Sequence, residues 1–353
     1  MRTIAVLNQK GGVGKTTTVA NTAAALAAGG ERVMVLDMDP QAHLTIHLGL
    51  EPQNVAGGVY RVLLQESSLA DDLMLVRPNL WILPANIDLV GAESELVSVV
   101  GREIILREAL STVQDAFDYC LIDCPPSLGL LTLNALAAAG EVLIPLQPHF
   151  LALQGFGKLL QTIELVNKRI NPTLRVTGIL LCMFDTRASL PQEVRNDIVQ
   201  FLDNARDGDS AWSQAQILPT FIRRNIKLAE APSYGRTIFE YDSDCHGAQD
   251  YLQVARFIAE MGQDRASEAA APVEHAAPLT QAPVVIEELP PRPKRQEDVE
   301  TMPTESTPDG LREPPHETQT RAAPQSKQAA PSTLTPYGNP FRGDEAGESG
   351  RTG

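Results

Sequence analysis

The feature that most constrains this chain is a glycine-rich loop between a strand pattern and a helix pattern close to the N-terminus. Residues 3–8 are a short apolar run typical of a β-strand, the loop QKGGVGKTT fills residues 9–17, and an alanine-rich helical segment follows. In the phosphate-loop pattern GxxxxGK[ST], the glycines let backbone N–H groups face phosphate, the lysine neutralises charge and the hydroxyl binds magnesium. The strand–loop–helix context predicts such a loop here.

The loop departs from the strict pattern at its start. Gln9 stands where the first glycine is expected, and Lys10 adds a second lysine upstream of Lys15. A plain structural turn can also be rich in glycine, but the full run KGGVGKTT between strand and helix disfavours that interpretation. The residues predicted to bind the nucleotide are Lys10, Gly11, Gly12, Val13, Gly14, Lys15, Thr16 and Thr17.

Beyond the loop, β-branched apolar runs alternate with longer stretches of helical period. That alternation predicts an α/β fold with a doubly wound, mostly parallel sheet flanked by helices. Runs such as VMVLD and YCLID are apolar on both faces, as central parallel strands require. Strands are expected at residues 3–8, 32–38, 80–84, 119–123, 141–146, 175–183 and 214–218, and helices at residues 15–28, 103–113, 151–169, 191–202 and 248–261.

Two acidic motifs follow predicted strands, where doubly wound folds bind ligands. Asp37 and Asp39 end the strand at residues 32–38, and the alternation of strand side chains would point both carboxylates the same way. The alternative is that the two acids simply cap a strand. Asp123 closes the run YCLID, as the aspartate of a Walker B strand does. Its carboxylate is expected to hold magnesium opposite Thr16.

The run KGGVGKTT, with its extra lysine, resembles the deviant Walker A loop of the ParA/MinD superfamily of ATPases. LIDCPP at residues 121–126 is similar to a motif of that family, and TFIRRNIKLAEAPSYG at residues 220–235 resembles the chromosomal ParA (Soj-like) group. The resemblance covers residues 1–263. Three places depart from the family pattern: Arg223 replaces a usual proline near the expected adenine pocket, Gln154 replaces a usual glutamate, and Ala42-His43 replace a usual Gly-Asn.

The resemblance implies an ATP hydrolase that uses ATP and Mg²⁺ and is slow until a partner protein stimulates it. It gives the catalytic roles to Lys10, Lys15 and Asp39. Asp39 would position the hydrolytic water, and Lys10 would reach the nucleotide of the second subunit in an ATP-dependent homodimer. The implied function is chromosome or plasmid partitioning with a ParB-type centromere-binding partner. The expected magnesium residues are Thr16, Asp123 and, through water, Asp37.

The net charge of −15 argues against nucleic-acid binding if it is taken for the whole chain, because phosphate contacts need local positive charge. A basic cluster nevertheless occurs at residues 223–227, and Arg206 precedes it. From the residues alone, a solvated basic turn is the usual interpretation. The resemblance favours non-specific binding of double-stranded DNA, as in Soj-like dimers. The candidate DNA-binding residues are Arg223, Arg224, Lys227 and Arg195.

The last part of the chain, residues 264–353, differs in composition from the rest. It holds 14 of the 26 prolines, is rich in alanine, and carries 15 acidic against 9 basic residues. This composition predicts a disordered acidic tail behind an ATPase domain at residues 1–263. Because no apolar run is long enough for a membrane span and no signal pattern begins the chain, we expect a cytoplasmic protein. The DNA binding that the resemblance implies would make it nucleoid-associated.

The superfamily leaves two further functions open. A ParA-like ATPase that positions a protein cargo, such as a chemosensory cluster or a carboxysome, would share the chemistry and differ in its partner. A MinD-like membrane switch would need a C-terminal amphipathic helix with basic and bulky apolar faces. The tail here is rich in proline and acidic residues, which disfavours that function.

Overall fold

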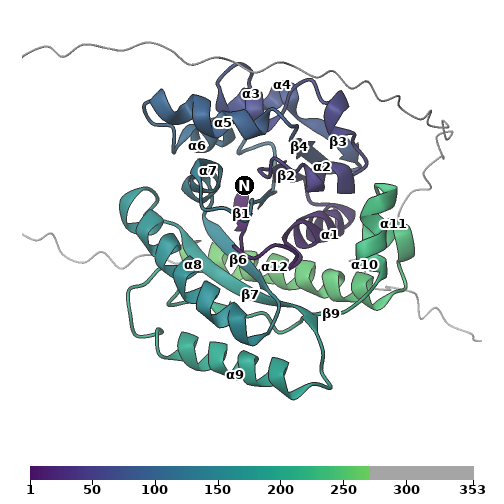
Figure 1. Cartoon of the computed structure of the whole chain (residues 1–353), viewed down its shortest axis with the longest axis vertical. Helices are drawn as coiled ribbons and strands as arrows, with labels where there is room; N and C mark the ends of the chain where they lie inside the picture. The colour runs from purple at the N-terminus through teal and green to yellow at the C-terminus, as the bar shows by residue number, and fades with distance from the viewer. Residues whose placement is uncertain (271–353) are drawn as a thin grey trace, which may run out of the picture. The chain divides into compact units, whose positions relative to one another are not determined.

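The computed structural model describes residues 1–270, apart from the side chains of residues 150–152, 154 and 263–270. Its central feature is a nine-stranded sheet (Figure 1). The strands are β1 (Arg2–Val6), β2 (Val33–Asp37), β3 (Met74–Arg77), β4 (Leu80–Leu83), β5 (Tyr119–Asp123), β6 (Glu141–Leu146), β7 (Arg175–Phe184), β8 (Gln216–Ile217) and β9 (Ile222–Arg223).

Helices connect most of the strands. The longer ones are α1 (Lys15–Ala28), α7 (Leu130–Ala138), α8 (Phe150–Arg169), α9 (Ser189–Asp203) and α12 (His246–Ala270). The shorter ones are α2 (His43–His47), α3 (Val59–Leu63), α4 (Leu69–Asp72), α5 (Leu89–Glu95), α6 (Ile105–Ser111), α10 (Lys227–Glu230) and α11 (Ile238–Asp242), with 3₁₀ turns η1 (Pro52–Asn54), η2 (Leu96–Ser98) and η3 (Ala231–Tyr234).

The order of the strands confirms the predicted doubly wound sheet. The neighbours run β3-β4-β2-β5-β1-β6-β7-β8, with β9 paired to β7, and every pairing is parallel except that of β3 with β4. All seven predicted strands are present, as are the five predicted helices, which became α1, α6, α8, α9 and α12. Apolar runs and helical periods therefore identified seven of the nine strands and four of the five longer helices.

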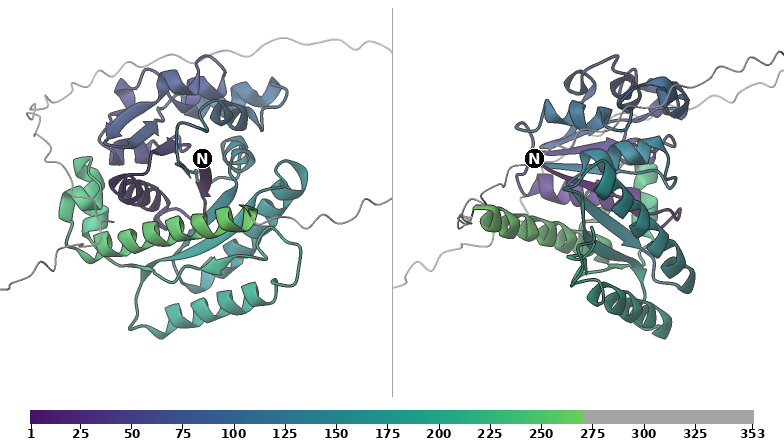
Figure 2. Two further views of the ribbon diagram at one scale, coloured as in Figure 1. Left: turned by 180° about the vertical axis from the view of Figure 1, so that it is seen from behind. Right: turned by 90° about the vertical axis from the view of Figure 1, so that its left-hand side faces the viewer.

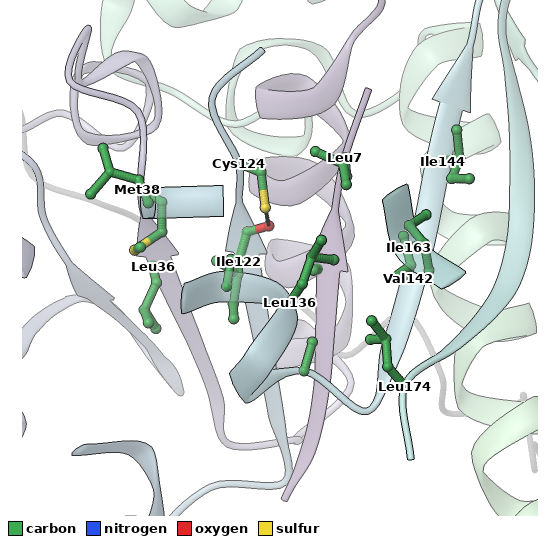
Figure 3. Close-up of a cluster of buried hydrophobic side chains, with 14 of the residues drawn as sticks. Leu7, Leu36, Met38, Ile122, Cys124, Leu136, Val142, Ile144, Ile163 and Leu174 are labelled. Carbon is green, nitrogen blue, oxygen red and sulfur yellow. Dashed lines mark hydrogen bonds between the residues drawn. The ribbon is translucent and has the colours of Figure 1, made fainter. Parts of the chain in front are cut away.

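The sheet is covered on both faces because alternate residues of each central strand point to opposite sides. On β1, Ile4 and Val6 belong to one buried cluster, while Ala5 belongs to the other. Figure 2 shows α12 on one side of the sheet and α8 and α9 on the other. Figure 3 shows the second cluster, in which strand residues pack against Leu136 of α7 and Ile163 of α8.

The elements that were not predicted are short, lie at an edge or lack a period. β3 is an antiparallel edge strand with an irregular register, and its Leu75 is 62% exposed. α7 is apolar almost all round, so it shows no amphipathic pattern. α12 continues to Ala270, so residues 264–270 of the expected tail are helical, and residues 271–353 lie outside the described residues.

The strands that carry the nucleotide motifs are neighbours. β5 lies between β1 and β2, and Asp123 at its end is in register with Val6 on one side and Asp37 on the other. The loop that follows β1 thus starts beside two aspartates from separate strands. Among residues 1–270, none of the helices combines the length and apolar character that a membrane span requires.

Candidate functional site

The loop after β1 has the backbone shape of an anion-binding turn. Gly12 (φ 73°) and Gly14 (φ 97°) adopt left-handed conformations that side chains disfavour, and a Cβ on Gly12 would meet no atom within 4 Å. Lys15 begins α1 directly after Gly14. The first turn of α1 holds no acidic residue, so its N–H groups remain available to a negatively charged ligand.

A hydroxyl–carboxylate pair, of which the carboxylate is fully buried, lies beside this loop. The Thr16 hydroxyl donates to Oδ2 of Asp123 at 2.7 Å, which joins the start of α1 to the end of β5. The other oxygen of Asp123, Oδ1, is buried and has no hydrogen-bond partner among the described residues. Burial and the neighbouring charge of Asp37 raise the pKa of Asp123 well above its usual range.

That orphaned oxygen fits a cation site. Mg²⁺ in nucleotide sites takes one or two protein oxygens and completes its octahedron with water and phosphate, so a dense cluster of acids is not required. Within residues 1–270 no group of three or more His, Cys, Asp or Glu side chains is placed to hold a metal. Thr16 and Asp123 therefore supply the donor set that a nucleotide-bound magnesium needs.

Asp37 accepts hydrogen bonds on both of its carboxylate oxygens. Its Oδ2 accepts hydrogen bonds from the backbone N–H and the hydroxyl of Thr45, at 2.8 and 2.7 Å, and its Oδ1 accepts from the N–H of Asp39 at 3.2 Å. Both oxygens thus hold the segment between β2 and α2. Burial raises the pKa of Asp37 to about 6, although these hydrogen bonds oppose the shift.

Asp37 and Asp39 differ in exposure. Asp37 is fully buried, whereas Asp39 is half-buried and lines the cavity beside the loop. β2 ends at Asp37, so Asp39 lies in the loop that follows the strand. The carboxylate of Asp39 accepts from the N–H of Gln41 at 3.0 Å and stays at the cavity surface.

The cavity has a volume of about 1100 Å³ and two contrasting sides. We call the first the phosphate side; it consists of the glycines and hydroxyls of the loop with Lys15 and Asp39. We call the second the basic wall; it is the segment of residues 222–233, most of which line the cavity. The space between them is large enough for a nucleotide, since small-molecule sites span about 300–1000 Å³.

Ion pairs hold two cations of the basic wall. Arg223 donates to both carboxylate oxygens of Asp250 on α12, with its Nη2 2.5 Å from Oδ1, and its backbone N–H donates to Oδ2 at 2.9 Å. Lys227 pairs with Asp242. Arg224 is exposed and has no ion pair within the described part of the chain. Arg195 is exposed on α9, away from this cavity lining.

Lys10 lies apart from the other loop residues. It does not line the cavity, and its ammonium group contacts Nε2 of His149, the residue that precedes α8. Sequence reasoning had not singled out His149, Thr45 or Asp250. Each of these is far from its partner in the sequence or lies outside a motif, so only the fold brings the pair together.

The comparisons agree with this geometry. The family model described as an AAA domain matches residues 1–176. A crystal structure of cobyrinic acid a,c-diamide synthase from Mycobacterium smegmatis, with bound ATP analog and magnesium, is 37% identical and superposes with a TM-score of 0.64, covering 75% of this chain and 97% of that one.

Two curated relatives are closer in sequence and cover most of residues 1–270. The sporulation initiation inhibitor protein Soj of Bacillus subtilis is 44% identical over 260 residues, which is 73% of this chain and 98% of Soj. The chromosome partitioning protein ParA of Caulobacter vibrioides is 41% identical over 273 residues, which is 76% of this chain and 98% of ParA. The chain belongs to the Soj/ParA family of chromosome-partitioning ATPases.

Proposed function

We propose that this chain is an ATP-dependent, dimerising ATPase switch that partitions a chromosome or plasmid together with a ParB-type partner. The observation that carries the proposal is the Thr16–Asp123 pair with its orphaned Oδ1, beside the anion-binding start of α1. Kinship with partitioning proteins supports the biological role. Such a switch would also bind double-stranded DNA without sequence preference. The protein would then lie on the nucleoid in the cytoplasm.

The phosphate side suits ATP hydrolysis. The N–H groups of the loop and Lys15 would bind the β- and γ-phosphates, and Thr16 and Asp123 would hold Mg²⁺, which neutralises charge on the phosphate oxygens. Asp39, at the cavity surface, would orient the water that attacks the γ-phosphorus while the bond to the β-phosphate oxygen breaks. Asp37 would hold the Asp39 segment in place, and so would act on magnesium only through water.

The position of Lys10 supports a role in a dimer. Because its side chain lies outside its own cavity, it is free of the phosphates that this chain would bind and can reach a second subunit across a two-fold axis. In a two-fold dimer, the contact between Lys10 and the nucleotide of the other subunit occurs twice. ATP would thereby stabilise the dimer, and loss of the γ-phosphate would weaken it.

Light scattering of the Lys10→Ala variant tests the dimer. In the hydrolysis-blocked Asp39→Ala background, we expect ATP to produce dimers that the additional Lys10→Ala change removes. Lys158→Ala, at an exposed lysine of α8, serves as the matched control and should leave the dimer fraction unchanged. An equal dimer fraction in the two lysine variants would contradict the role of Lys10.

Arg224 is the cation of the basic wall best suited to DNA. Arg223 and Lys227 are engaged by Asp250 and Asp242, whereas Arg224 is exposed, and Arg195 adds a charge on α9. Binding through such residues would be independent of sequence and would weaken steeply with salt. Dimerisation doubles the number of phosphate contacts, which would make DNA binding depend on ATP.

Charge reversal of Arg224 tests this interface. In the Asp39→Ala background with ATP, Arg224→Glu should lower the affinity for random-sequence duplex DNA and flatten its salt dependence. Arg169→Glu, at an exposed arginine of α8, is the control of equal charge change. Similar losses in both variants would indicate a general charge effect and no DNA site at the basic wall.

The partner can be identified by capture on the ATP-bound Asp39→Ala protein. Recovery of a ParB-type protein together with DNA is expected, and such a partner should accelerate hydrolysis by the wild-type protein. Recovery of a protein assembly without DNA would instead favour the positioning of a protein cargo.

A further inference from the structure

The lysine that enters the phosphate loop is held by groups outside the nucleotide cavity. The backbone N–H of Lys10 donates to Oδ1 of Asn8 at 3.0 Å, and the amide of Asn8 donates to the carbonyl of Pro145 at 2.7 Å. The Lys10 ammonium contacts Nε2 of His149, which lies four residues after Pro145 in the sequence. The backbone of Lys10 is thus linked through Asn8 to the end of β6, and its side chain to the residue that precedes α8.

The contact requires a neutral imidazole. A lysine ammonium has only donors, so the His149 nitrogen it meets must offer a lone pair. Partial burial and the Lys10 charge both lower the pKa of His149, which favours this neutral form. Lys10 is the charged side chain that acts on the ring within the described residues, and residues 150–157 contain no titratable side chain.

We infer that His149 is a positioning residue that holds Lys10 in the monomer and competes with the ATP-bound dimer for it. The inference rests on the proposed role of Lys10 in that dimer. One ammonium group cannot contact its own His149 and also lie on the phosphates of a second subunit, which would be a rival acceptor of greater charge. Release of Lys10 from the imidazole is therefore one step of dimer formation.

The competition makes dimerisation depend on pH in a defined direction. In the monomer, partial burial and, on top of it, the charge of Lys10 hold the pKa of His149 below its ordinary value of 6.5. Once Lys10 leaves, that pKa returns towards the ordinary value, so the dimer binds more protons than the monomer. Mass action then favours the dimer as the pH falls from about 7.5 through about 6.5, until the monomer's imidazole is protonated too.

The first experiment measures the dimer dissociation constant by analytical ultracentrifugation with ATP in the Asp39→Ala background, between pH 7.5 and pH 5.8. We expect dimerisation to tighten by about threefold or more on acidification. His149→Ala should dimerise more tightly at pH 7.5, because nothing holds Lys10. His149→Gln keeps an acceptor without a titrating group, so it should match the parent at pH 7.5 and respond less to acid.

These three variants also separate His149 from other titrating groups. All other groups of the chain are the same in the parent, His149→Ala and His149→Gln proteins, so a difference among the three reports on position 149. Two results would overturn the inference: an unchanged pH response in His149→Gln, or a dimer of His149→Ala no tighter than the parent at pH 7.5.

A second measurement is independent of the dimer. In the nucleotide-free monomer, NMR titration of the His149 imidazole should give a lower pKa in the wild-type protein than in Lys10→Ala. Equal values would show that the contact does not act on the ring and would overturn the inference by themselves. If ATP produces no dimers at all, the proposed function fails while this titration still reports on the Lys10–His149 contact.

Discussion

The phosphate side and the basic wall of the cavity are built in opposite ways. The phosphate side follows directly from the ends of β1, β2 and β5, three adjacent strands in register, and Asp37 and Asp123 at two of these ends are fully buried. The basic wall comes from one two-residue strand, a single helical turn and a 3₁₀ turn. Its cations Arg223 and Lys227 are partly exposed and are held by acids of α12 and α11.

The difference indicates where chemistry and where regulation belong. Groups at buried strand ends have few alternative positions, which suits the alignment of phosphate, metal and water. Groups on short, exposed elements can move when a ligand or a second macromolecule binds. We therefore expect substitutions on the phosphate side to abolish nucleotide chemistry and substitutions on the basic wall to change stability and partner binding.

The largest effect is expected for Lys15→Ala. Lys15 is 8% exposed at the start of α1, and loss of a buried charged contact to phosphate costs about 4 kcal/mol, or roughly a thousandfold in ATP affinity. Calorimetric titration with a non-hydrolysable ATP analogue measures this. Arg224→Ala, on the basic wall of the same cavity, should lose less than about tenfold. Equal losses would break the distinction between the two sides.

His47 lies on α2, which contacts η3, and it lines the cavity. The dependence of stability on pH therefore tests the junction between the phosphate side and the basic wall. His47 is 1% exposed, and burial together with the charge of Arg77 lowers its pKa to about 4. The unfolded chain takes up this proton near pH 6.5, so stability is complete above that value and falls as the pH drops from 6.5 towards 4. The loss attributable to His47 approaches about 3 kcal/mol.

Urea unfolding of His47→Gln isolates that contribution. The variant cannot titrate at this position, so between pH 7.5 and pH 4.5 it should lose less stability than the wild-type protein, by about 2–3 kcal/mol. Identical losses would mean that the imidazole gains solvent or a partner on acidification, and that the junction between the two sides is looser than the structure shows.

The contrast between the sides also explains how far the sequence could be interpreted. Gly12, Gly14, Lys15 and Thr16 were identified because they follow a strand pattern at a fixed spacing, and Asp123 because it ends an apolar run; neighbouring strand ends meet at one edge of the sheet. The difference in exposure between Asp37 and Asp39 could not be predicted, because it depends on where β2 ends, and strand boundaries are weakly encoded.

Pairings over long sequence distances could not be predicted at all. Asp250 lies 27 residues from Arg223, and His149 lies 139 residues from Lys10. An exposed basic run looks the same in sequence whether or not acids from another helix neutralise it. The cluster at residues 223–227 therefore gave no indication that Arg223 and Lys227 are paired.

The substitution Asp123→Asn separates function from stability beside the phosphate loop. Burial and Asp37 raise the pKa of Asp123, so ionisation of this carboxyl opposes folding above its usual titration range. Removing the charge should stabilise the nucleotide-free protein by about 1–2 kcal/mol and remove the increase in ATP affinity that Mg²⁺ produces. Urea unfolding and ATP titration with Mg²⁺ or with EDTA measure both effects. A variant that retained the magnesium response would exclude Asp123 as a ligand.

The smallest effects are expected for the two acids behind the basic wall, and they differ from each other. The Asp250 side chain is 5% exposed and accepts from the backbone and the guanidinium of Arg223, whereas the Asp242 side chain is 25% exposed. Asp250→Asn should destabilise the protein by about 1–2 kcal/mol, because a half-exposed arginine loses a buried partner. Asp242→Asn should change stability little, because surface pairs contribute little, and should instead free Lys227 and strengthen DNA binding. Urea midpoints and DNA affinities of the two variants test this ranking, and a larger destabilisation by Asp242→Asn would show that the wall is anchored through α11 and not through α12.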